Sequence, residues 1–426
     1  MIDSTAFLNP SFLYAASLSQ PSKDLFSHKQ LIPNLIHYSQ PDDPITMVTS
    51  PFMNSSTIAI PKFQNSKFAE TKTSTTMPTL STSTAASTTG STLAVNPTIA
   101  SRFNFQQPLG IVDKYILLAE LGQNHLYPVY LASSIFDTPD NSNLVVIKAI
   151  PASDYRGSFD NEKNVFQLKY HKNILRCSEI IKNARFFFSS PPNKTSKTTP
   201  TDEYYHVLVL KYHSNGDLLD FVKKQKLDER VARYYFSQVL DAVEHLHQNG
   251  YCHRDIKIEN ILLDENYDLV LTDFGHSVKH RDTKGERVFI EQSSITTPGI
   301  CPPEFHKGHG YRGIPMDIFA LGKLLLIFVT GFNPFKCAKD TDQNYNMILK
   351  GNWTSYWRVT QNWMKKKWIK TDNFNKDLKA LLELMLNPDP SKRPSIKQIR
   401  ESNWFKKTQP VSPEEARIAM IRAKNS

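Results

Sequence analysis

The stretch His253-Arg254-Asp255-Ile256-Lys257-Ile258-Glu259-Asn260, followed by Thr272-Asp273-Phe274-Gly275, decides the fold of this chain. Between the two pieces, the apolar runs Ile261-Leu262-Leu263 and Leu269-Val270-Leu271 flank the polar residues 264–268. Apolar runs on either side of a short polar turn predict a β-hairpin. The sequence therefore predicts a polar loop, a hairpin and a second polar turn in succession, with the charged and amide side chains in a fixed geometry.

The composition is that of a folded intracellular protein. The chain has 426 residues, of which 40% are hydrophobic, enough for about two or three domains with a sizeable core. The four cysteines show neither close pairing nor metal-ligand spacing, which favours reduced thiols. The N-terminus lacks a basic region followed by an apolar one, so no secretory signal is expected. We expect the protein in the cytoplasm, the nucleus or both.

No membrane segment is expected, because the longest apolar stretch, Leu321 to Val329, is interrupted by Lys323 and reads as a buried helix. The formal net charge is +10. A basic chain fits an anionic nucleotide ligand, and equally an acidic partner or nucleic acid. No basic helix interleaved with aromatic residues occurs, so nucleic acid is not expected as a partner.

The chain divides into three regions. Residues 1–110 are Ser/Thr/Pro-rich, and 71–92 are nearly all Thr, Ser, Ala, Gly and Pro, which predicts disorder. Short apolar islands there are either docking sites for partners or incidental. Residues 114–405 carry a folded pattern in which strands come first and helices follow, which predicts an α+β fold with segregated parts. Residues 406–426 form a short tail, in which Ser412-Pro413-Glu414-Glu415 has the spacing of a helix capping box.

Hydrophobic periodicity and turn residues locate the elements of the folded region. Strands are expected at Tyr115 to Leu131 (strand, turn, strand), Asn143 to Ile150, Ile174 to Phe188 and Tyr205 to Lys211. Helices are expected at Asp160 to Tyr170, 217–225, 228–249, 315–331, 376–386 and 395–402.

With these motifs in order and at the right spacing, residues 114–405 resemble a eukaryotic protein kinase catalytic domain. The resemblance implies a two-lobed fold, with a small β-rich N-lobe at about 114–212 and a larger helical C-lobe at about 213–405. It implies ATP and Mg²⁺ as cofactors and protein hydroxyls as acceptors. Lys257 stands where serine/threonine-specific members carry lysine. Gly331-Phe332-Asn333-Pro334-Phe335 leans toward the calmodulin-dependent kinase group.

The resemblance also implies the roles of the catalytic residues. Asp255 would accept or steer the proton of the substrate hydroxyl, and Lys257 would touch the moving phosphate. Asn260 and Asp273 would bind Mg²⁺, which neutralises charge on the transferred phosphoryl oxygens.

The nucleotide site follows in the same way. Lys148, in Val145-Val146-Ile147-Lys148, would grip the α- and β-phosphates and pair with Glu162. A cation on a buried strand is costly unless it is paired. The other nucleotide-binding residues implied are Leu121, Gly122, Val129, Leu210 at the back of the pocket, and Tyr212 at the hinge.

The phosphate-covering loop departs from the family pattern G-x-G-x-x-G-x-V. In Gly122-Gln123-Asn124-His125-Leu126-Tyr127-Pro128-Val129 only the first glycine remains. Glycine lets backbone amides approach phosphates without a side chain in the way. Tyr127 is bulky and Pro128 lacks an amide donor, so replacing Tyr127 by glycine is expected to tighten ATP binding. This loop leaves a second reading open, a pseudokinase scaffold or nucleotide-binding module.

Four further expectations concern the C-lobe. Glu304 should pair with Arg393, and Asp317 should anchor the catalytic loop. Arg254 suggests that an anion in the activation segment, Asp273 to Glu304, orders this loop, and Ser293, Ser294 and Thr296 are the candidate phosphate acceptors. The alternative is constitutive order, with Glu286 or Glu291 in place of a phosphate. Asp217 and Glu259 stand where related kinases read basic residues near the target, whereas Ile327 is apolar at the third such position.

Overall fold

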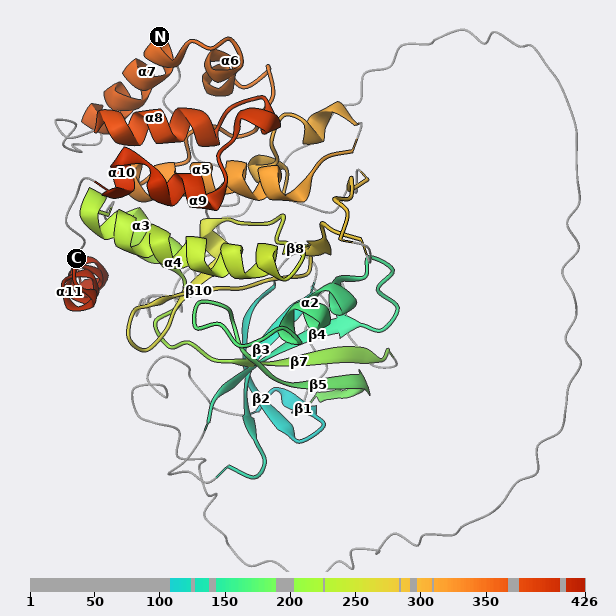
Figure 1. The fold of residues 1–426 in the computed structure, drawn as a ribbon. Coiled ribbons are helices and arrows are strands. Elements are labelled where there is room, and N and C mark those ends of the chain that lie inside the picture. Colours follow the sequence, from blue (N-terminus) through green and yellow to red (C-terminus); the bar gives the residue numbers. More distant parts are fainter. Residues whose placement is uncertain are drawn as a thin grey trace, which may run out of the picture. The chain divides into compact units, whose positions relative to one another are not determined.

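A computed structural model gives the fold of the protein and places strands at one end of the catalytic region and helices at the other (Figure 1). It describes residues 108–123, 127–137, 143–188, 203–224, 227–282, 285–291, 297–308, 310–366, 375–406 and 411–425. The expected disordered region at 1–110 lies almost wholly outside these residues. The α+β class and the two-lobed arrangement are confirmed.

The N-lobe is a 7-stranded antiparallel sheet with the order β5-β7-β4-β3-β2-β1-β6. Both of its faces are buried. Ile147 and Val209 belong to one apolar cluster, whereas Leu208 and Leu210 belong to the other, which continues into the C-lobe. The strands are β1 (Gly110–Val112), β2 (Tyr115–Gln123), β3 (Pro128–Ser134), β4 (Val145–Pro151), β5 (Cys177–Ala184), β6 (Phe186–Phe188) and β7 (Tyr205–Lys211).

The expected strands are present, with two differences. The sheet extends before Lys114, because Gly110–Val112 pairs with both β2 and β6. The helix expected at Asp160 to Tyr170 is α2, Ser158–Phe166, and its end was placed four residues too late. After Phe166 the chain leaves the helix and runs to the C-lobe, where the Leu175 amide donates to the Leu271 carbonyl at 2.9 Å. This contact between distant segments outweighs the helical spacing of the residues after Phe166.

The C-lobe is helical. The five helices expected there are confirmed within a few residues, while α6, α7 and the one-turn α10 were not predicted. Asp342 caps α6 by accepting from the amides of Asn344 and Tyr345. The helices are α3 (Leu218–Lys224), α4 (Glu229–Gln248), α5 (Gly313–Thr330), α6 (Gln343–Leu349), α7 (Trp353–Lys366), α8 (Lys376–Met385), α9 (Ile396–Glu401), α10 (Asn403–Lys406) and α11 (Pro413–Asn425).

The apolar helix α5 is the centre of the C-lobe. Within the described residues it alone is long and apolar enough to cross a membrane, and 89% of it is buried inside the domain. Gly322 permits its close contact with α8, since a Cβ at this position would lie 2.9 Å from the Met385 Cβ. The expected buried helix is therefore confirmed.

The predicted hairpin is formed by β9 (Ile261–Leu263) and β10 (Leu269–Leu271), which pair antiparallel. A second short pair joins β8 (Tyr251–Cys252) to β11 (Val278–Lys279). Together these two-stranded sheets hold both ends of the polar loop and of the turn that the sequence singled out.

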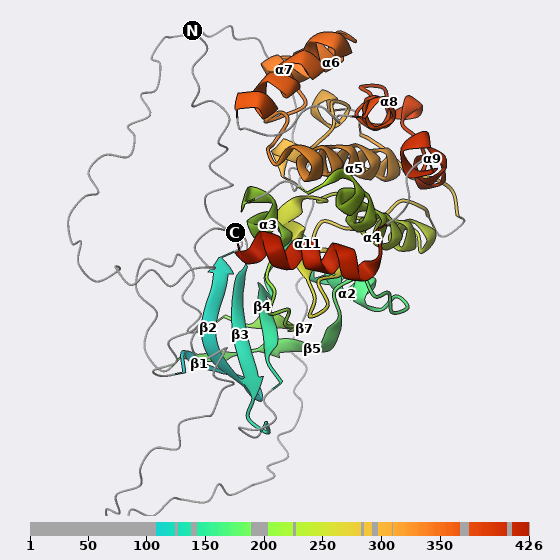
Figure 2. The same ribbon diagram turned by 90° about the vertical axis from the view of Figure 1, so that its left-hand side faces the viewer.

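The tail forms α11, which lies against α3 and α4 (Figure 2). The predicted capping box is confirmed, because Ser412 Oγ accepts from the Glu415 amide at 3.2 Å and Glu415 Oε2 accepts from the Ser412 amide at 2.8 Å. Ala416 and Met420 are fully buried. Lys424 donates to Asn215 Oδ1 at 2.9 Å, which ties the helix to the segment after β7.

Candidate active site

Three charged side chains from β4, α2 and the turn after β10 meet between the lobes. Lys148 Nζ lies 2.5 Å from Glu162 Oε1 and 2.8 Å from Asp273 Oδ1. Lys148 and Glu162 are 5% and 1% exposed, so each charge depends on its partners rather than on water. The structure therefore shows the expected pairing of Lys148 with Glu162, and it adds Asp273, which the sequence assigned to the metal, as a second partner of Lys148.

The electrostatics keep the lysine and the aspartate charged. Burial alone would lower the pKa of Lys148, but the carboxylates of Asp273 and Glu162 outweigh it, and the pKa is raised. Burial would raise the pKa of Asp273, but Lys148 holds it well below the ordinary range. Burial raises the pKa of Glu162 against the opposing charge of Lys148. Asp273 is thus available as an anionic ligand at neutral pH.

Asp255, Lys257 and Asn260 form a second cluster in the loop before β9. One carboxylate oxygen of Asp255, Oδ2, lies 2.8 Å from Lys257 Nζ and accepts from Asn260 Nδ2 at 2.9 Å. The other oxygen, Oδ1, is buried and has no hydrogen-bond partner within the described part of the chain. Such an oxygen is poised to accept a hydrogen bond from a ligand hydroxyl.

The backbone of both clusters is strained and firmly held. Arg254 and Asp273 have φ values of 65° and 64°, in the left-handed region that such side chains rarely adopt. The fully buried carboxylate of Asp317 accepts from the amides of His253 at 2.9 Å and Arg254 at 2.8 Å. The expected anchoring role of Asp317 is confirmed.

Aromatic packing joins the polar loop to the turn and to α2. The ring of Phe274 lies 5.3 Å from that of His253 and 5.6 Å, edge-on, from that of Phe166. The Thr272 amide also donates to the Asn260 carbonyl at 3.0 Å. His253 and Phe274 thus pack against each other, and this packing extends to the end of α2.

The phosphate-covering loop holds a contact that the sequence did not reveal. Tyr127 is 5% exposed, and its hydroxyl donates to Ser158 Oγ in the first turn of α2 at 2.7 Å. Lys148 Nζ lies 5.8 Å from the centre of the Tyr127 ring. The bulky side chain turns into the core and links the loop to the helix that carries Glu162.

The other expected nucleotide residues line the sheet near Lys148. Gly122 and Val129 are partners in the β2–β3 register, and Val129 is also the partner of Lys148 in β3–β4. Leu121 lies beside Gly122 in β2. Buried Leu210 pairs with Val146, and Tyr212 follows directly after β7. The side chain of Tyr212 makes no hydrogen bond or ion pair with the polar clusters in the described chain.

The catalytic loop, residues 253–260, contacts the activation segment and also Tyr311, which follows that segment in the chain. Arg254 Nη1 donates to the buried hydroxyl of Tyr311 at 2.8 Å, and its Nε donates to the His276 carbonyl at 2.7 Å. The sequence did not reveal Tyr311. Lys257 Nζ donates to Thr297 Oγ1 at 2.9 Å. The candidate acceptors Ser293, Ser294 and Thr296 lie outside the described residues.

An ion pair and hydrogen bonds attach the end of the activation segment to the C-lobe. Arg393 Nη1 and Nη2 donate to the two carboxylate oxygens of Glu304 at 2.6 Å and 2.7 Å, which confirms the expected pair. Lys323, which in the sequence only interrupted an apolar run, is 3% exposed and donates to the carbonyls of Gly299 and Phe335. Burial lowers its pKa to about 8.

The acidic residues expected to read the substrate lie in different environments. Asp217 Oδ1 accepts from the Asp220 amide at 3.2 Å at the start of α3. Burial raises the pKa of Glu259, while the positive charges of Lys257 and Lys323 oppose that rise. Ile327 is 7% exposed within the core.

This fold and these clusters define a class, the two-lobed protein kinase domain, and comparison with known proteins agrees. The protein kinase domain family matches residues 120–405. The chain belongs to the protein kinase family.

Two relatives from plants illustrate the similarity. The CBL-interacting serine/threonine-protein kinase 20 of Arabidopsis thaliana is 31% identical over 318 residues, which cover 72% of this chain and 63% of the relative. The CBL-interacting protein kinase 26 of Oryza sativa subsp. japonica is 29% identical over 310 residues, or 71% of this chain and 54% of the relative. The chain thus spans about half to five eighths of the length of these relatives.

Proposed function

We propose that this protein is a serine/threonine protein kinase that transfers the γ-phosphoryl group of Mg-ATP to hydroxyls of protein substrates. The observation that carries the proposal is the Asp255 carboxylate. Lys257 and Asn260 fix one of its oxygens, and the other is buried with no partner in the described chain. A substrate hydroxyl would donate to that oxygen and pass its proton there as it bonds to the γ-phosphorus, while the bond from this phosphorus to the β,γ-bridging oxygen breaks and ADP leaves.

The residues present fit a magnesium nucleotide. Magnesium prefers hard oxygen ligands and takes few of them from the protein. Asp273 supplies an ionised carboxylate. Asn260 uses its amide nitrogen toward Asp255, which leaves its amide oxygen free to face a metal. We assign the metal to Asn260 and Asp273; when bound, it neutralises charge on the transferred phosphoryl group.

The remaining site residues hold the nucleotide or orient the side chains that contact it. Lys148 holds the α- and β-phosphates, and Glu162 keeps its ammonium group in place. Lys257 lies between Asp255 and Thr297, so it links the catalytic carboxylate to the segment on which a substrate would lie. Leu121, Gly122 and Val129 cover the nucleotide. Leu210 and Tyr212 bound the adenine pocket, where backbone groups bind the base.

The finer assignments rest on sequence motifs. We place the chain in the calmodulin-dependent-kinase-like group and expect substrates with basic residues near the target, attracted by Asp217 and Glu259. The plant relatives are named for interaction with CBL; for this chain we propose docking partners of the N-terminal region.

The domain boundaries follow as residues 1–110, 114–405 and 406–426, with the lobes meeting near residue 212. We propose a location in the cytoplasm, the nucleus or both, because all four cysteines are free thiols.

Phosphoamino-acid analysis tests the proposal. Purified full-length protein is incubated with [γ-³²P]ATP, Mg²⁺ and peptides that carry serine, threonine or tyrosine downstream of arginine. Label on serine and threonine is expected, and Asp255→Asn should abolish it. The matched control Glu265→Gln, on the exposed hairpin turn, should leave it unchanged. Nucleotide binding without transfer would favour the pseudokinase scaffold.

A further inference from the structure

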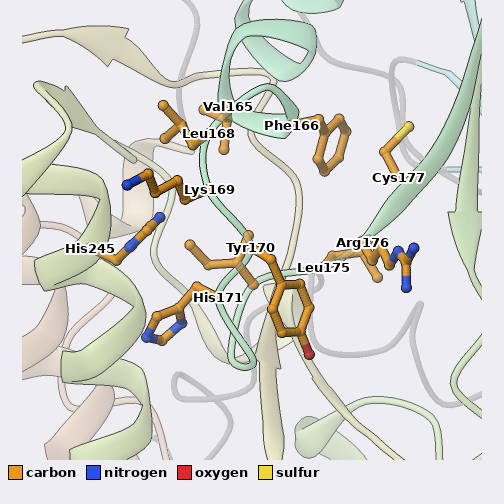
Figure 3. Close-up of a pocket in the computed structure, with 11 residues that line it drawn as sticks. Val165, Phe166, Leu168, Lys169, Tyr170, His171, Leu175, Arg176, Cys177 and His245 are labelled. Carbon is orange, nitrogen blue, oxygen red and sulfur yellow. The ribbon is translucent and has the colours of Figure 1, made fainter.

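A cavity, separate from the clusters above, opens where the end of α2 meets α4. Its volume is about 320 Å³. Figure 3 shows Lys169, His171 and His245 on one side of it and Phe166, Arg176 and Cys177 on the other. This size lies at the lower end of the range of small-ligand pockets, and it accommodates one large side chain with its neighbours.

The floor and the rim of this cavity differ in chemistry. The floor is apolar, formed by Val165, Phe166, Leu168, Ile174 and Leu175. The rim carries the cations of Lys169 and Arg176 together with the imidazoles of His171 and His245, and no carboxylate lines the cavity. The rings of the two histidines lie 5.0 Å apart, and the Nε2 atom of His245 is buried without a hydrogen-bond partner in the described chain.

The positive charge at the rim is not neutralised locally. In the described residues the side chains of Lys169, Lys172 and Arg176 are exposed and make neither an ion pair nor a hydrogen bond. The nearest acidic residues of α4, Asp241 and Glu244, are instead engaged by Arg400, at 2.5 Å and 3.4 Å. Lys172 lies outside the cavity lining, so the basic surface extends beyond the opening.

We propose that this cavity docks an acidic peptide segment of a partner protein, which inserts one aromatic or large aliphatic side chain onto the apolar floor. The carboxylates beside that side chain face Lys169, Lys172 and Arg176. A peptide fits better than a small molecule, because the basic surface extends beyond the cavity and exposed Tyr170, 75% accessible, stands at its edge. This complementarity of an apolar pocket with a charged rim is that of a peptide anchor site.

Docking here would act on the active site, and this part rests on the proposed kinase function. The floor residue Phe166 packs edge-on against Phe274, next to the metal-binding Asp273. Phe166 also ends α2, one turn beyond Glu162. A side chain packed against Phe166 stabilises this arrangement of α2, so the peptide is expected to raise the rate of phosphorylation.

Fluorescence polarisation on full-length protein tests the docking. The probe is a fluorescein-labelled peptide with one phenylalanine flanked by three glutamates on each side. Saturable binding is expected. Replacing the phenylalanine by alanine, or the double change Lys169→Glu/Arg176→Glu, should weaken it at least about tenfold. The control Lys350→Glu/Lys397→Glu reverses two exposed charges elsewhere and should bind like the wild type.

The outcomes separate the inference from the proposed function. Binding by the wild type that the rim variant loses, with unchanged melting temperature, supports the site even in an inactive enzyme. A catalytically active wild type that does not bind the probe, or binds it as tightly after Lys169→Glu/Arg176→Glu, overturns the inference alone. Concentration-dependent self-association lost in the rim variant would assign the cavity to a second copy and overturn the proposal too. Stimulation of phosphorylation by the peptide, at least about twofold and absent in the rim variant, tests the coupling.

Discussion

Removing the Tyr127 hydroxyl should loosen α2 without emptying the core. In Tyr127→Phe the ring stays, but the bond of 2.7 Å to Ser158 is lost. The Ser158 hydroxyl is 1% exposed, so it loses its partner in a place that water does not reach. Losing a hydrogen bond and leaving a buried group unsatisfied costs about 1–2 kcal/mol. At about 2–4 °C per kcal/mol for large domains, the melting temperature should fall by about 2–8 °C in differential scanning calorimetry.

The same change bears on catalysis, because Ser158 and Glu162 are one turn apart on α2. If the whole cost of about 1–2 kcal/mol falls on the aligned state of Glu162, kcat/KM drops by about fivefold to thirtyfold, since about 1.4 kcal/mol corresponds to a factor of ten. Tyr127→Gly removes the ring as well and opens a cavity, at a cost of about 3–5 kcal/mol. The loop sequence by itself suggests that Tyr127→Gly tightens ATP binding. From the structure we expect instead that Tyr127→Gly weakens the fold.

A double-mutant cycle with Ser158→Ala isolates the bond. The two single changes should each destabilise the protein, and the double variant should lose clearly less than their sum. Strict additivity, or an unchanged melting temperature in Tyr127→Phe, would show that the hydroxyl contact contributes nothing. A lower KM for ATP in a stable Tyr127→Gly variant would refute the account of this loop.

Three further predictions concern the C-lobe. Burial lowers the pKa of Lys323 to about 8 from 10.5, so between these pH values the unfolded chain binds more protons and stability rises with pH, by about 3 kcal/mol in all. Chemical denaturation of wild type and Lys323→Met should therefore diverge as the pH rises from 7 to 10, and parallel curves would contradict this. Met420→Ala on the buried side of α11 should cost about 2–5 kcal/mol, whereas Ile418→Ala, 37% exposed, should cost little. Equal effects in urea titrations would mean that α11 does not pack as described. Glu304→Ala leaves the Arg393 guanidinium without its carboxylate partner and should lower the free energy of unfolding by about 3–5 kcal/mol. Lys392→Ala, next to Arg393 in the chain, should leave this free energy nearly unchanged. Similar melting temperatures for these two variants would argue against the ion pair.

Local patterns could be predicted from the sequence. The hairpin after Asn260 was predicted because apolar runs flank a polar turn. The capping box at Ser412 was predicted because the four residues from Ser412 to Glu415 define it. The pairing of Lys148 with Glu162 followed because a buried lysine requires an acidic partner and the motif offered one.

Contacts between distant segments could not be predicted. Tyr127 reads as an obstacle in its loop, since nothing local indicates that Ser158 will lie beneath it. Tyr311, which binds Arg254, carries no motif at all. Lys323 looks like a break in an apolar helix, and only the fold brings the Gly299 and Phe335 carbonyls to its ammonium group. In each case the partner is set by tertiary packing.

Asp273 and Asp255 serve phosphoryl transfer from Mg-ATP in the proposed function, and a comparison of turnover with and without the Asp273 carboxylate decides whether they do. Initial rates of peptide phosphorylation are measured for wild type and Asp273→Ala at equal concentration, with circular dichroism to show that both are folded. Loss of the carboxylate that we propose as a metal ligand should lower kcat/KM by about a thousandfold or more. A folded Asp273→Ala variant that phosphorylates the peptide at the wild-type rate would contradict the account.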